Sequence, residues 1–228
     1  MTDFILHGIP GSPYVRAVAL ALEEKRARWR LDAVPMGGHR DPAYRAIHPF
    51  HKIPTLDHGD FRLYETAAVL RYIDRALPSR VLIPEDSKRE ARMDQLISMT
   101  NDYMVSRVSG VLSFNRRIAP MLGWPVDEEA VRNGIGPAED TIAEFARLLG
   151  DAPYMTGDTL SLADLMVVSH VAFLPEFAEG QALLAAQPNL AAWLMRMEAR
   201  PSMVATSWDA LIALTGVDTK APGASIAA

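Results

Sequence analysis

The chain contains no cysteine. Disulfide bonds, cysteine-ligated metal sites and a cysteine nucleophile are therefore excluded. The six histidines and the carboxylates show no paired helical spacing of the kind that metal sites use, so we expect no metal. The G-x-S-x-G motif that marks many serine hydrolases is also absent.

The chain also lacks a long hydrophobic run. Its longest apolar stretch, residues 162–174, is interrupted by Asp164 and His170. A membrane-spanning helix needs about 20 apolar residues, so this stretch is too short and too polar. The N-terminal residues lack the basic start of a secretory signal. We therefore expect a cytoplasmic protein with no membrane partner.

An excess of basic residues is missing as well. The chain carries 23 Lys and Arg against 28 Asp and Glu, a net charge of −5. A nucleic-acid-binding surface usually needs a basic excess, so no nucleic acid is expected as a partner. A local basic patch would still suit an anionic small molecule.

The first 77 residues alternate strand and helix patterns. A short apolar strand at residues 4–6 precedes a helix with apolar positions at i, i+3, i+4 and i+7. An alternating strand follows at 29–33, and two short runs around a Gly/Asp turn at 53–63 predict a hairpin. With a helix from Thr66 to Leu77, this order predicts an α/β domain, βαβ-α-ββα, with a mixed four-stranded sheet.

The remainder of the chain shows only helical periodicity. Residues 78–86 are expected to form a linker, and residues 87–228 an all-α domain. Ser87 and Glu90 have the spacing of a capping box, which predicts a helix start at Ser87. Further helices are expected over Asp127–Leu149, from Ser161, over Asn189–Ala199 and around Met203–Leu214.

Ser12 and Pro13 open the first expected helix. Serine is a favoured N-cap and proline is favoured in the first turn, so the simplest interpretation is a helix cap. The same geometry also suits an anion, because a helix N-terminus presents N–H groups and a positive dipole end. A thiolate held there has a lowered pKa, and the Ser12 hydroxyl can donate a further hydrogen bond. Both interpretations stay open on these residues alone.

Two further pairs and three cations complete a candidate binding set. Ile53-Pro54 is either an ordinary strand start or, if the bond is cis, a backbone position open to an extended ligand. Glu65-Thr66 is either a second helix cap or a site for the ammonium and carboxylate of an amino-acid head group. Positive charge for a second carboxylate is available from His39, Arg40 and Lys52, each of which is alternatively a solvated surface residue.

These residues lie in segments that resemble glutathione transferases. The N-terminal segments are GIPGSPYVRAVALALEE, GGHRDP, HPFHKIPTL and HGDFRLYETAAVLRYI, which resemble the family's thioredoxin-like domain. GDTLSLADLMVVSHVAFL and PNLAAWLMRMEARP resemble its helical domain, with Ser161 and Asp164 as a buried capping box. Ser12 and the His39-Arg40 pair are similar to positions of the serine-type members, phi-like and bacterial. The resemblance spans nearly the whole chain.

The resemblance implies a glutathione S-transferase, with glutathione as co-substrate and Ser12 as the catalytic residue. The glutathione sulfur would meet Ser12 as a thiolate, and the cysteinyl backbone of glutathione would pair with Ile53 beside Pro54. Its γ-glutamyl head would meet Glu65 and Thr66. Its glycine carboxylate would lie near His39, Arg40 and Lys52.

The chain departs from the family pattern at four positions. Histidines stand at 48 and 51 where the family usually has Asn and Gly, and His51 adds bulk near the glycine end of glutathione. Arg40 replaces a lysine and Thr66 a serine, which keep the charge and the hydroxyl.

The resemblance also implies a pocket for a small hydrophobic electrophile and a homodimer. The candidate pocket residues are Ile9, Pro10, Gly11, Met104, Arg107, Val108, Val111 and Phe114. Methionines of the long helix are alternatively core residues. Asp102 is a candidate for reaching a partner's glutamyl site.

Two other functions remain open at this point. A non-catalytic binding module of the same fold would have lost the thiol activator or the head-group site, whereas Ser12, Glu65 and Thr66 are all present. A specialised glutathione-dependent dehalogenase, ether-cleaving enzyme or isomerase would share the first domain and differ in the helical half.

Overall fold

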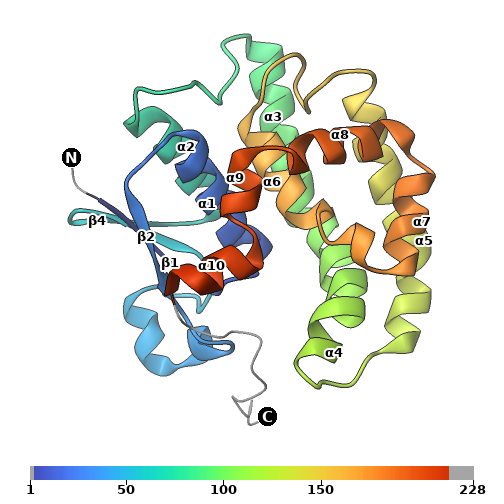
Figure 1. Ribbon diagram of the computed structural model, residues 1–228, viewed down its shortest axis with the longest axis horizontal. Helices are drawn as coiled ribbons and strands as arrows, with labels where there is room; N and C mark the ends of the chain where they lie inside the picture. Colours follow the sequence, from blue (N-terminus) through green and yellow to red (C-terminus); the bar gives the residue numbers. More distant parts are fainter. Residues whose placement is uncertain (1–2, 216–228) are drawn as a thin grey trace. The chain divides into compact units, whose positions relative to one another are not determined.

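A computed structural model describes residues 3–215 of the chain and divides it into two compact units (Figure 1). Among the described residues, the first unit comprises the chain up to Val81 together with Arg200–Thr215, and the second comprises Leu82–Ala199. The division by sequence pattern placed all of residues 87–228 in one helical domain. The structure instead groups the described residues after Arg200 with the α/β unit.

The first unit is built on a four-stranded sheet with the order β2-β1-β3-β4. Strand β1 (Phe4–Gly8) pairs in parallel with β2 (Trp29–Ala33) and antiparallel with β3 (Thr55–His58), which pairs antiparallel with β4 (Phe61–Tyr64). The expected βαβ unit and hairpin are therefore confirmed. The hairpin turn is tighter than expected, because the strand runs through His58 and leaves only Gly59 and Asp60 between the strands.

Two helices pack against this sheet and against each other: α1 (Pro13–Glu24) and α2 (Thr66–Ala76). The apolar positions that predicted α1 are fully buried, among them Val15, Val18 and Leu22. Burial of such side chains contributes about 1.5–3 kcal/mol each, so this core fixes the turn from which α1 starts. Two short 3₁₀ turns, η1 (Gly38–Arg40) and η2 (Pro42–Ala46), connect β2 to β3.

A histidine ties three neighbouring strands together. His7 on β1 is buried, and its two ring nitrogens each lie 2.8 Å from a carboxylate oxygen, one of Asp32 on β2 and one of Asp57 on β3. This polar bridge crosses the sheet beside the turn that carries Ser12.

A buried lysine fastens the far end of α1. The Lys25 ammonium donates to the backbone and side-chain oxygens of Asp74 in α2 and to the carbonyls of Ser79 and Arg80, at 2.8–3.0 Å. The ammonium thereby joins α1, α2 and the segment that leaves the domain.

The tail of the first unit consists of two short helices, α9 (Pro201–Ala205) and α10 (Trp208–Thr215). The prediction of a single helix around Met203–Leu214 was wrong, because the helical hydrogen bonding stops at Thr206 and restarts after Ser207. The Ser207 hydroxyl accepts from the backbone N–H of Ala210 and so caps the second helix. In Figure 1, α9 lies against α1 and α10 lies across β2.

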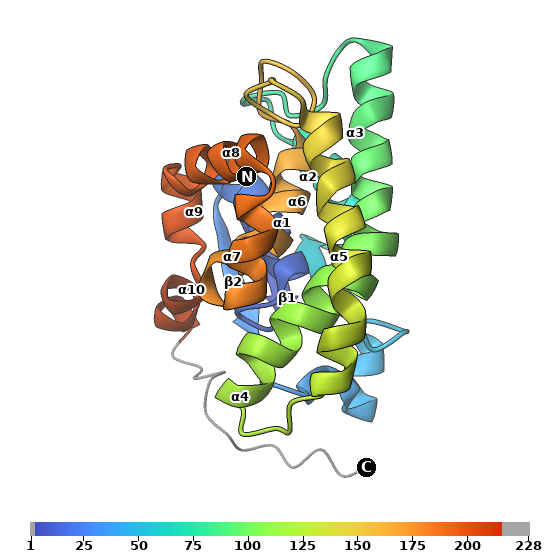
Figure 2. The same cartoon turned by 90° about the vertical axis from the view of Figure 1, so that its right-hand side faces the viewer.

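The second unit is helical, as expected. Its elements are α3 (Ser87–Met99), η3 (Thr100–Ile118), α4 (Ala119–Met121), α5 (Glu128–Leu149), α6 (Leu162–Val171), η4 (Leu174–Glu176), α7 (Ala178–Ala185) and α8 (Pro188–Glu198). Helix α5 packs along η3, and Figure 2 shows it running beside the helix formed by α3 and η3. The helices expected from Asp127, Ser161 and Asn189 are confirmed to within one or two residues.

Two features of this unit differ from the expectations. The N-cap of α3 is Asp86 and not Ser87, because the Asp86 carboxylate accepts from the backbone N–H of Arg89. The helix that follows α3 is π-helical over Thr100–Ile118, and its wider turns leave no mark in the apolar spacing.

The buried capping box of α6 is confirmed. Both Oδ atoms of Asp164 are used: the backbone N–H and hydroxyl of Ser161 donate to one, and the Met155 N–H and the Trp193 indole donate to the other. All four distances are 2.8–2.9 Å. Burial raises the pKa of Asp164 above its ordinary value, although these donors oppose the shift. Within residues 3–215, no helix is long and apolar enough to cross a membrane.

Candidate functional site

The turn between β1 and α1 sets the position of Ser12. Gly11 has φ +91°, a conformation that other residues rarely adopt, and Ser12 is extended with φ −68° and ψ 128°. The Ser12 N–H donates to the Ile9 carbonyl at 3.1 Å, and the Ser12 carbonyl accepts from the Arg16 N–H at 2.9 Å. The backbone of Ser12 is therefore held on both sides.

The Ser12 side chain does not cap the helix. It stands at the N-cap position, yet its hydroxyl accepts no hydrogen bond from the first turn of α1. An N-cap hydroxyl normally satisfies one of these backbone donors and contributes about 1 kcal/mol. The Ser12 hydroxyl is half-exposed at the positive end of the α1 dipole, where it can donate to an anion.

A cis peptide bond joins Ile53 to Pro54 at the start of β3. The Ile53 side chain is partly buried against the cluster of Ile9, Val34 and Tyr44. Within the described part of the chain, the N–H and C=O of Ile53 have no hydrogen-bond partner. They can therefore pair with an extended ligand.

Glu65 and Thr66 form the junction between β4 and α2. Glu65 is exposed at the N-cap position with φ +70° and ψ 106°, and its side chain makes no capping bond. A non-glycine residue in such a conformation costs about 1–3 kcal/mol, and such residues cluster at functional sites. Thr66 is buried at the first turn of α2. A carboxylate and a helix N-terminus thus lie side by side.

The loop between β2 and β3 carries the cationic residues. Arg40 and Lys52 are exposed, whereas His39 is half-buried and its Nδ1 has no partner among the described residues. The His51 Nδ1 lies 3.1 Å from the His39 carbonyl, and His51 has φ +54°. Burial, Arg40 and His51 together lower the pKa of His39. His39 is therefore neutral at pH 7, and the positive charge of this loop comes from Arg40 and Lys52.

His48, which departs from the family pattern, has a structural role. It is buried, its Nδ1 accepts from the Phe50 N–H at 3.2 Å, and its ring lies 4.7 Å from the Tyr64 ring. Burial lowers the pKa of His48, and Lys52 and His51 add to this, while Glu65 opposes it. The Phe50 ring, by contrast, is 65% exposed.

The candidate pocket residues fall into two groups. Ile9 and Pro10 are buried and Gly11 is half-buried in the first unit. On η3 of the second unit, Met104 and Val108 are fully buried, as core residues are, and so have no surface for a ligand. The other three retain exposed surface: Arg107, Val111 and Phe114. Asp102 on the same segment is exposed.

One residue at this site was not found from the sequence. Trp208 at the start of α10 lies against Gly11, so closely that a Cβ on Gly11 would come within 2.2–2.7 Å of the indole. Trp208 is itself buried. The contact joins positions at opposite ends of the chain, and no local pattern indicates it.

A metal centre has no support in the described residues. Residues 3–215 hold no group of three or more His, Asp or Glu side chains that is placed to bind a metal ion.

Comparison with known proteins gives consistent matches over both units. The family model described as glutathione S-transferase, N-terminal domain, matches residues 6–80, and that of the C-terminal domain matches residues 136–205. Glutathione S-transferase 4 of Zea mays is 30% identical over 203 residues, which cover 86% of this chain and 88% of that protein. A glutathione S-transferase of Hyoscyamus muticus is 29% identical over 201 residues, covering 86% and 94%.

Solved structures give the same result. Glutathione S-transferase I from mais, in complex with an atrazine glutathione conjugate, superposes with a TM-score of 0.79 at 26% identity over 93% of this chain and 99% of that chain. Glutathione S-transferase III in its apo form superposes with a TM-score of 0.78 at 28% identity, covering 90% and 95%.

Proposed function

Since the chain belongs to the glutathione S-transferase family, we propose that it conjugates the glutathione thiolate to small hydrophobic electrophiles. Its relatives of 29–30% identity are named glutathione S-transferases, and one similar structure holds a glutathione conjugate. The protein is thus an enzyme whose co-substrate is glutathione. In the reaction, the thiol first loses its proton to solvent. The sulfur then forms a bond to an electrophilic carbon. A halide leaves with its electron pair, whereas an opened epoxide oxygen or the carbanion from an activated alkene takes up a proton from solvent.

The sulfur of glutathione is proposed to lie at Ser12. The observation that carries this proposal is the Ser12 hydroxyl, which stands at a helix N-terminus without capping it. A thiolate there gains the helix dipole and a hydrogen bond from the hydroxyl, and both lower its pKa. Ser12 stabilises the attacking sulfur and does not itself attack, so it needs no general base. This assignment makes the chain a serine-type, phi-like member of the family.

The rest of glutathione is proposed to follow the edge of the first unit. The γ-glutamyl ammonium meets the Glu65 carboxylate, and the γ-glutamyl carboxylate meets the Thr66 hydroxyl and the start of α2. The cysteinyl backbone pairs with the N–H and C=O of Ile53, beside cis Pro54. The strained backbone of Glu65 and the open hydrogen-bonding groups of Ile53 support these assignments.

The glycine carboxylate is proposed to lie near Arg40 and Lys52, which supply charge. His39 lies in the same loop and is neutral at pH 7, so it contributes a hydrogen bond and no charge. His51 stands beside His39, with its ring nitrogen at the His39 carbonyl.

The electrophile is proposed to bind beside the sulfur. In the first unit, the residues proposed to contact it are Ile9, Pro10 and Gly11, in the turn before Ser12. In the second unit, Arg107, Val111 and Phe114 on η3 are proposed as contacts because they keep exposed surface. Met104 and Val108 would support that surface from the core. In terms of function, residues 1–77 are then the glutathione-binding domain, to which the described tail from Arg200 is added, residues 78–86 are the linker, and the helical domain runs from residue 87 to Ala199. Residues 216–228 lie outside the described part.

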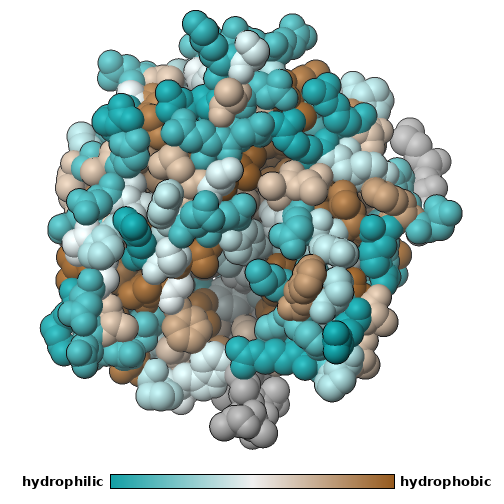
Figure 3. Space-filling view, turned by 180° about the vertical axis from the view of Figure 1, so that it is seen from behind, coloured by the Kyte–Doolittle hydropathy of each residue, from teal (hydrophilic) through white to brown (hydrophobic). Residues whose placement is uncertain are grey.

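The enzyme is further proposed to be a cytoplasmic homodimer. Its surface in Figure 3 shows hydrophobic residues scattered among hydrophilic ones. Phe50 is exposed, and its ring makes T-shaped contacts with the rings of His48 and Tyr64. Exposed aromatic side chains are enriched at protein interfaces.

Two measurements test the proposed function in sequence. The protein is applied to immobilised glutathione and eluted with free glutathione, and conjugation is then assayed over a panel of aromatic halides, epoxides and activated alkenes. Retention with turnover is expected. Retention without any turnover would favour a binding module of the same fold, and failure of both would contradict the function.

A further inference from the structure

The tail of the chain is clamped to α1 at three points. At the C-terminal end of α1, Arg200 donates two hydrogen bonds to the Glu24 carboxylate at 2.7 and 2.8 Å, and the Ser202 hydroxyl donates a third at 2.6 Å. In the middle, the Arg16 guanidinium donates to the Met203 carbonyl at 3.1 Å. At the N-terminal end, Trp208 packs on Gly11.

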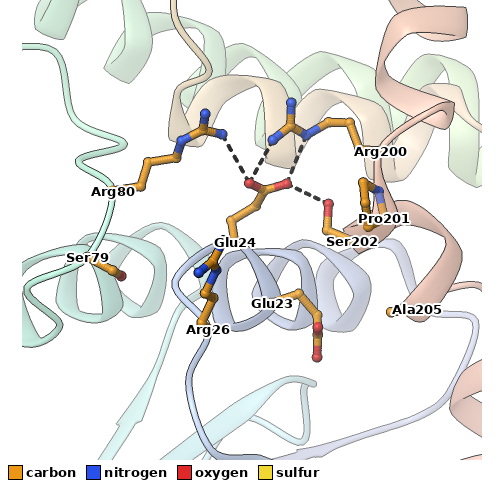
Figure 4. A pocket seen from close by; sticks show the side chains of 9 residues that line it. All are labelled: Glu23, Glu24, Arg26, Ser79, Arg80, Arg200, Pro201, Ser202 and Ala205. Carbon is orange, nitrogen blue, oxygen red and sulfur yellow. Dashed lines mark hydrogen bonds and ion pairs between the residues drawn. The ribbon is translucent and has the colours of Figure 1, made fainter.

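The clamp at Glu24 is the strongest of these contacts. Figure 4 shows Arg80 and Arg200 converging on the Glu24 carboxylate from two sides, with Ser202 beside them. Glu24 is largely buried, and although burial raises its pKa, hydrogen bonds from Arg200 and Ser202 hold that pKa below its ordinary value. A bidentate, partly buried Arg–carboxylate pair has fixed geometry. The surrounding cavity of about 680 Å³ is lined by two glutamates and three arginines, among them Glu24, Arg80 and Arg200, so we assign it to this clamp.

The contact at Gly11 lies one residue from Ser12. The fused edge of the Trp208 indole faces the side of Gly11 where any other residue would carry its Cβ. Since Gly11 adopts φ +91°, the turn depends on the glycine both for its backbone conformation and for its lack of a side chain. The packed indole holds this turn in place, and the conformation of the turn sets the position of the Ser12 hydroxyl and of the start of α1.

We propose that Trp208 is a positioning residue for the thiolate site, held over Gly11 by the Glu24–Arg200 clamp. This inference rests on the proposed function of Ser12. Its consequence is that the tail helices, far from the motifs of the first domain, set how well the sulfur is stabilised. A displacement of about 1 Å at a reacting group can cost up to about a hundredfold in rate, so the effect of losing the indole is measurable.

The first experiment compares Trp208→Ala and Trp208→Phe with the wild-type enzyme. For Trp208→Ala we expect kcat/KM at pH 7 to fall about tenfold, and the pH–rate profile to move about one unit to higher pH, because the bound thiol is less acidic. The KM for glutathione should change little, because its other proposed contacts lie in the loop before β3 and at the start of α2. Trp208→Phe retains a flat ring and should restore most of the activity. Leu214→Ala, at an exposed site on the same helix, serves as the control.

The second experiment does not depend on a destabilised variant. The chain has four tryptophans, so the wild-type protein labelled with 5-fluorotryptophan gives four fluorine resonances, and Trp208→Phe assigns one of them. Addition of glutathione should shift the Trp208 resonance more than that of Trp193, which is buried in the second unit.

The outcomes separate this inference from the proposed function. An alkaline shift in Trp208→Ala, or in Trp208→Leu where the alanine variant does not fold, supports the positioning role. An unshifted profile in the folded variant overturns it, as does a Trp208 resonance that glutathione leaves unmoved in an active enzyme. A wild-type protein that neither binds glutathione nor turns over overturns the proposed function itself.

Discussion

At the scale of single residues, the role proposed for Ser12 rests on a hydroxyl that makes no capping bond to α1. We expect Ser12→Ala to lower kcat/KM about 10- to 100-fold, because a hydrogen bond to a charged group is worth about 1.5–3 kcal/mol. The loss should fall mainly on kcat, with glutathione binding reduced only modestly. The pH–rate profile should move to higher pH, since the bound thiol loses a donor that favours its ionised form.

The matched control for this change is Ser12→Thr, which keeps a hydroxyl at the same position. Stopped-flow turnover and the thiolate absorbance of bound glutathione measure both variants. An alanine variant whose pH–rate profile coincides with that of the wild type would contradict the role assigned to Ser12, and would leave the helix N-terminus as the main stabilising group.

Glu65 offers a test in which stability and function should change in opposite directions. Its φ of +70° is unfavourable for glutamate and acceptable for glycine. Glu65→Gly should therefore stabilise the fold by up to about 1 kcal/mol, while the KM for glutathione rises at least about tenfold because the ammonium loses its carboxylate. Thermal unfolding and steady-state kinetics measure the two effects.

Arg26→Gly is the comparison for this experiment, because exposed Arg26 also has a positive φ, +52°, and lies outside the proposed glutathione site. It should relieve backbone strain without raising the KM. If Glu65→Gly also leaves the KM unchanged, the head-group site has been assigned to the wrong residue.

At the scale of secondary structure elements, the capping box of α6 is the most demanding polar feature. Asp164 is fully buried and accepts four hydrogen bonds from three elements. Asp164→Ala would leave these donors buried without an acceptor, so we expect a loss of about 3–5 kcal/mol of unfolding free energy. Urea unfolding followed by circular dichroism measures it. Ser161→Ala removes one of the four donors and should cost only about 1 kcal/mol; an equal loss in both variants would contradict this account.

The local signals of the sequence were sufficient for most elements. Apolar spacing located α1, α2, α5 and the sheet, because each buries one face and so needs a regular pattern. The same signals did not fix the first residue of α3, because Asp86 and Ser87 are both good N-caps. Only the hydrogen bond from the Arg89 N–H to Asp86 distinguishes them. The π-helical turns of η3 and the break between α9 and α10 were missed, because tertiary packing sets them.

The candidate site, too, could be predicted only where short motifs indicate it. Ser12, Ile53 and Glu65 could be proposed from short motifs, since each lies at the start of an element. The positive φ of Glu65 and the contact of Trp208 with Gly11 could not, because both depend on how distant segments meet. The hydrogen bonds between Glu24 and Arg200 also join segments that lie far apart in the sequence, so they could not be predicted either.

At the scale of the whole molecule, the exposed aromatic cluster leads to a prediction about assembly. Phe50 lies in the loop that carries the cationic residues, and it is 65% exposed while its neighbour His48 is buried. A large exposed aromatic side chain on a packed base is typical of residues that dominate interfaces. We therefore expect the wild-type protein to have twice the chain mass of 25.1 kDa in light scattering, and Phe50→Asp to have the mass of one chain. Met195→Asp, at a site that is 71% exposed, should leave the mass unchanged. A wild-type monomer, or a Phe50→Asp variant that remains dimeric, would show that Phe50 does not hold two copies together.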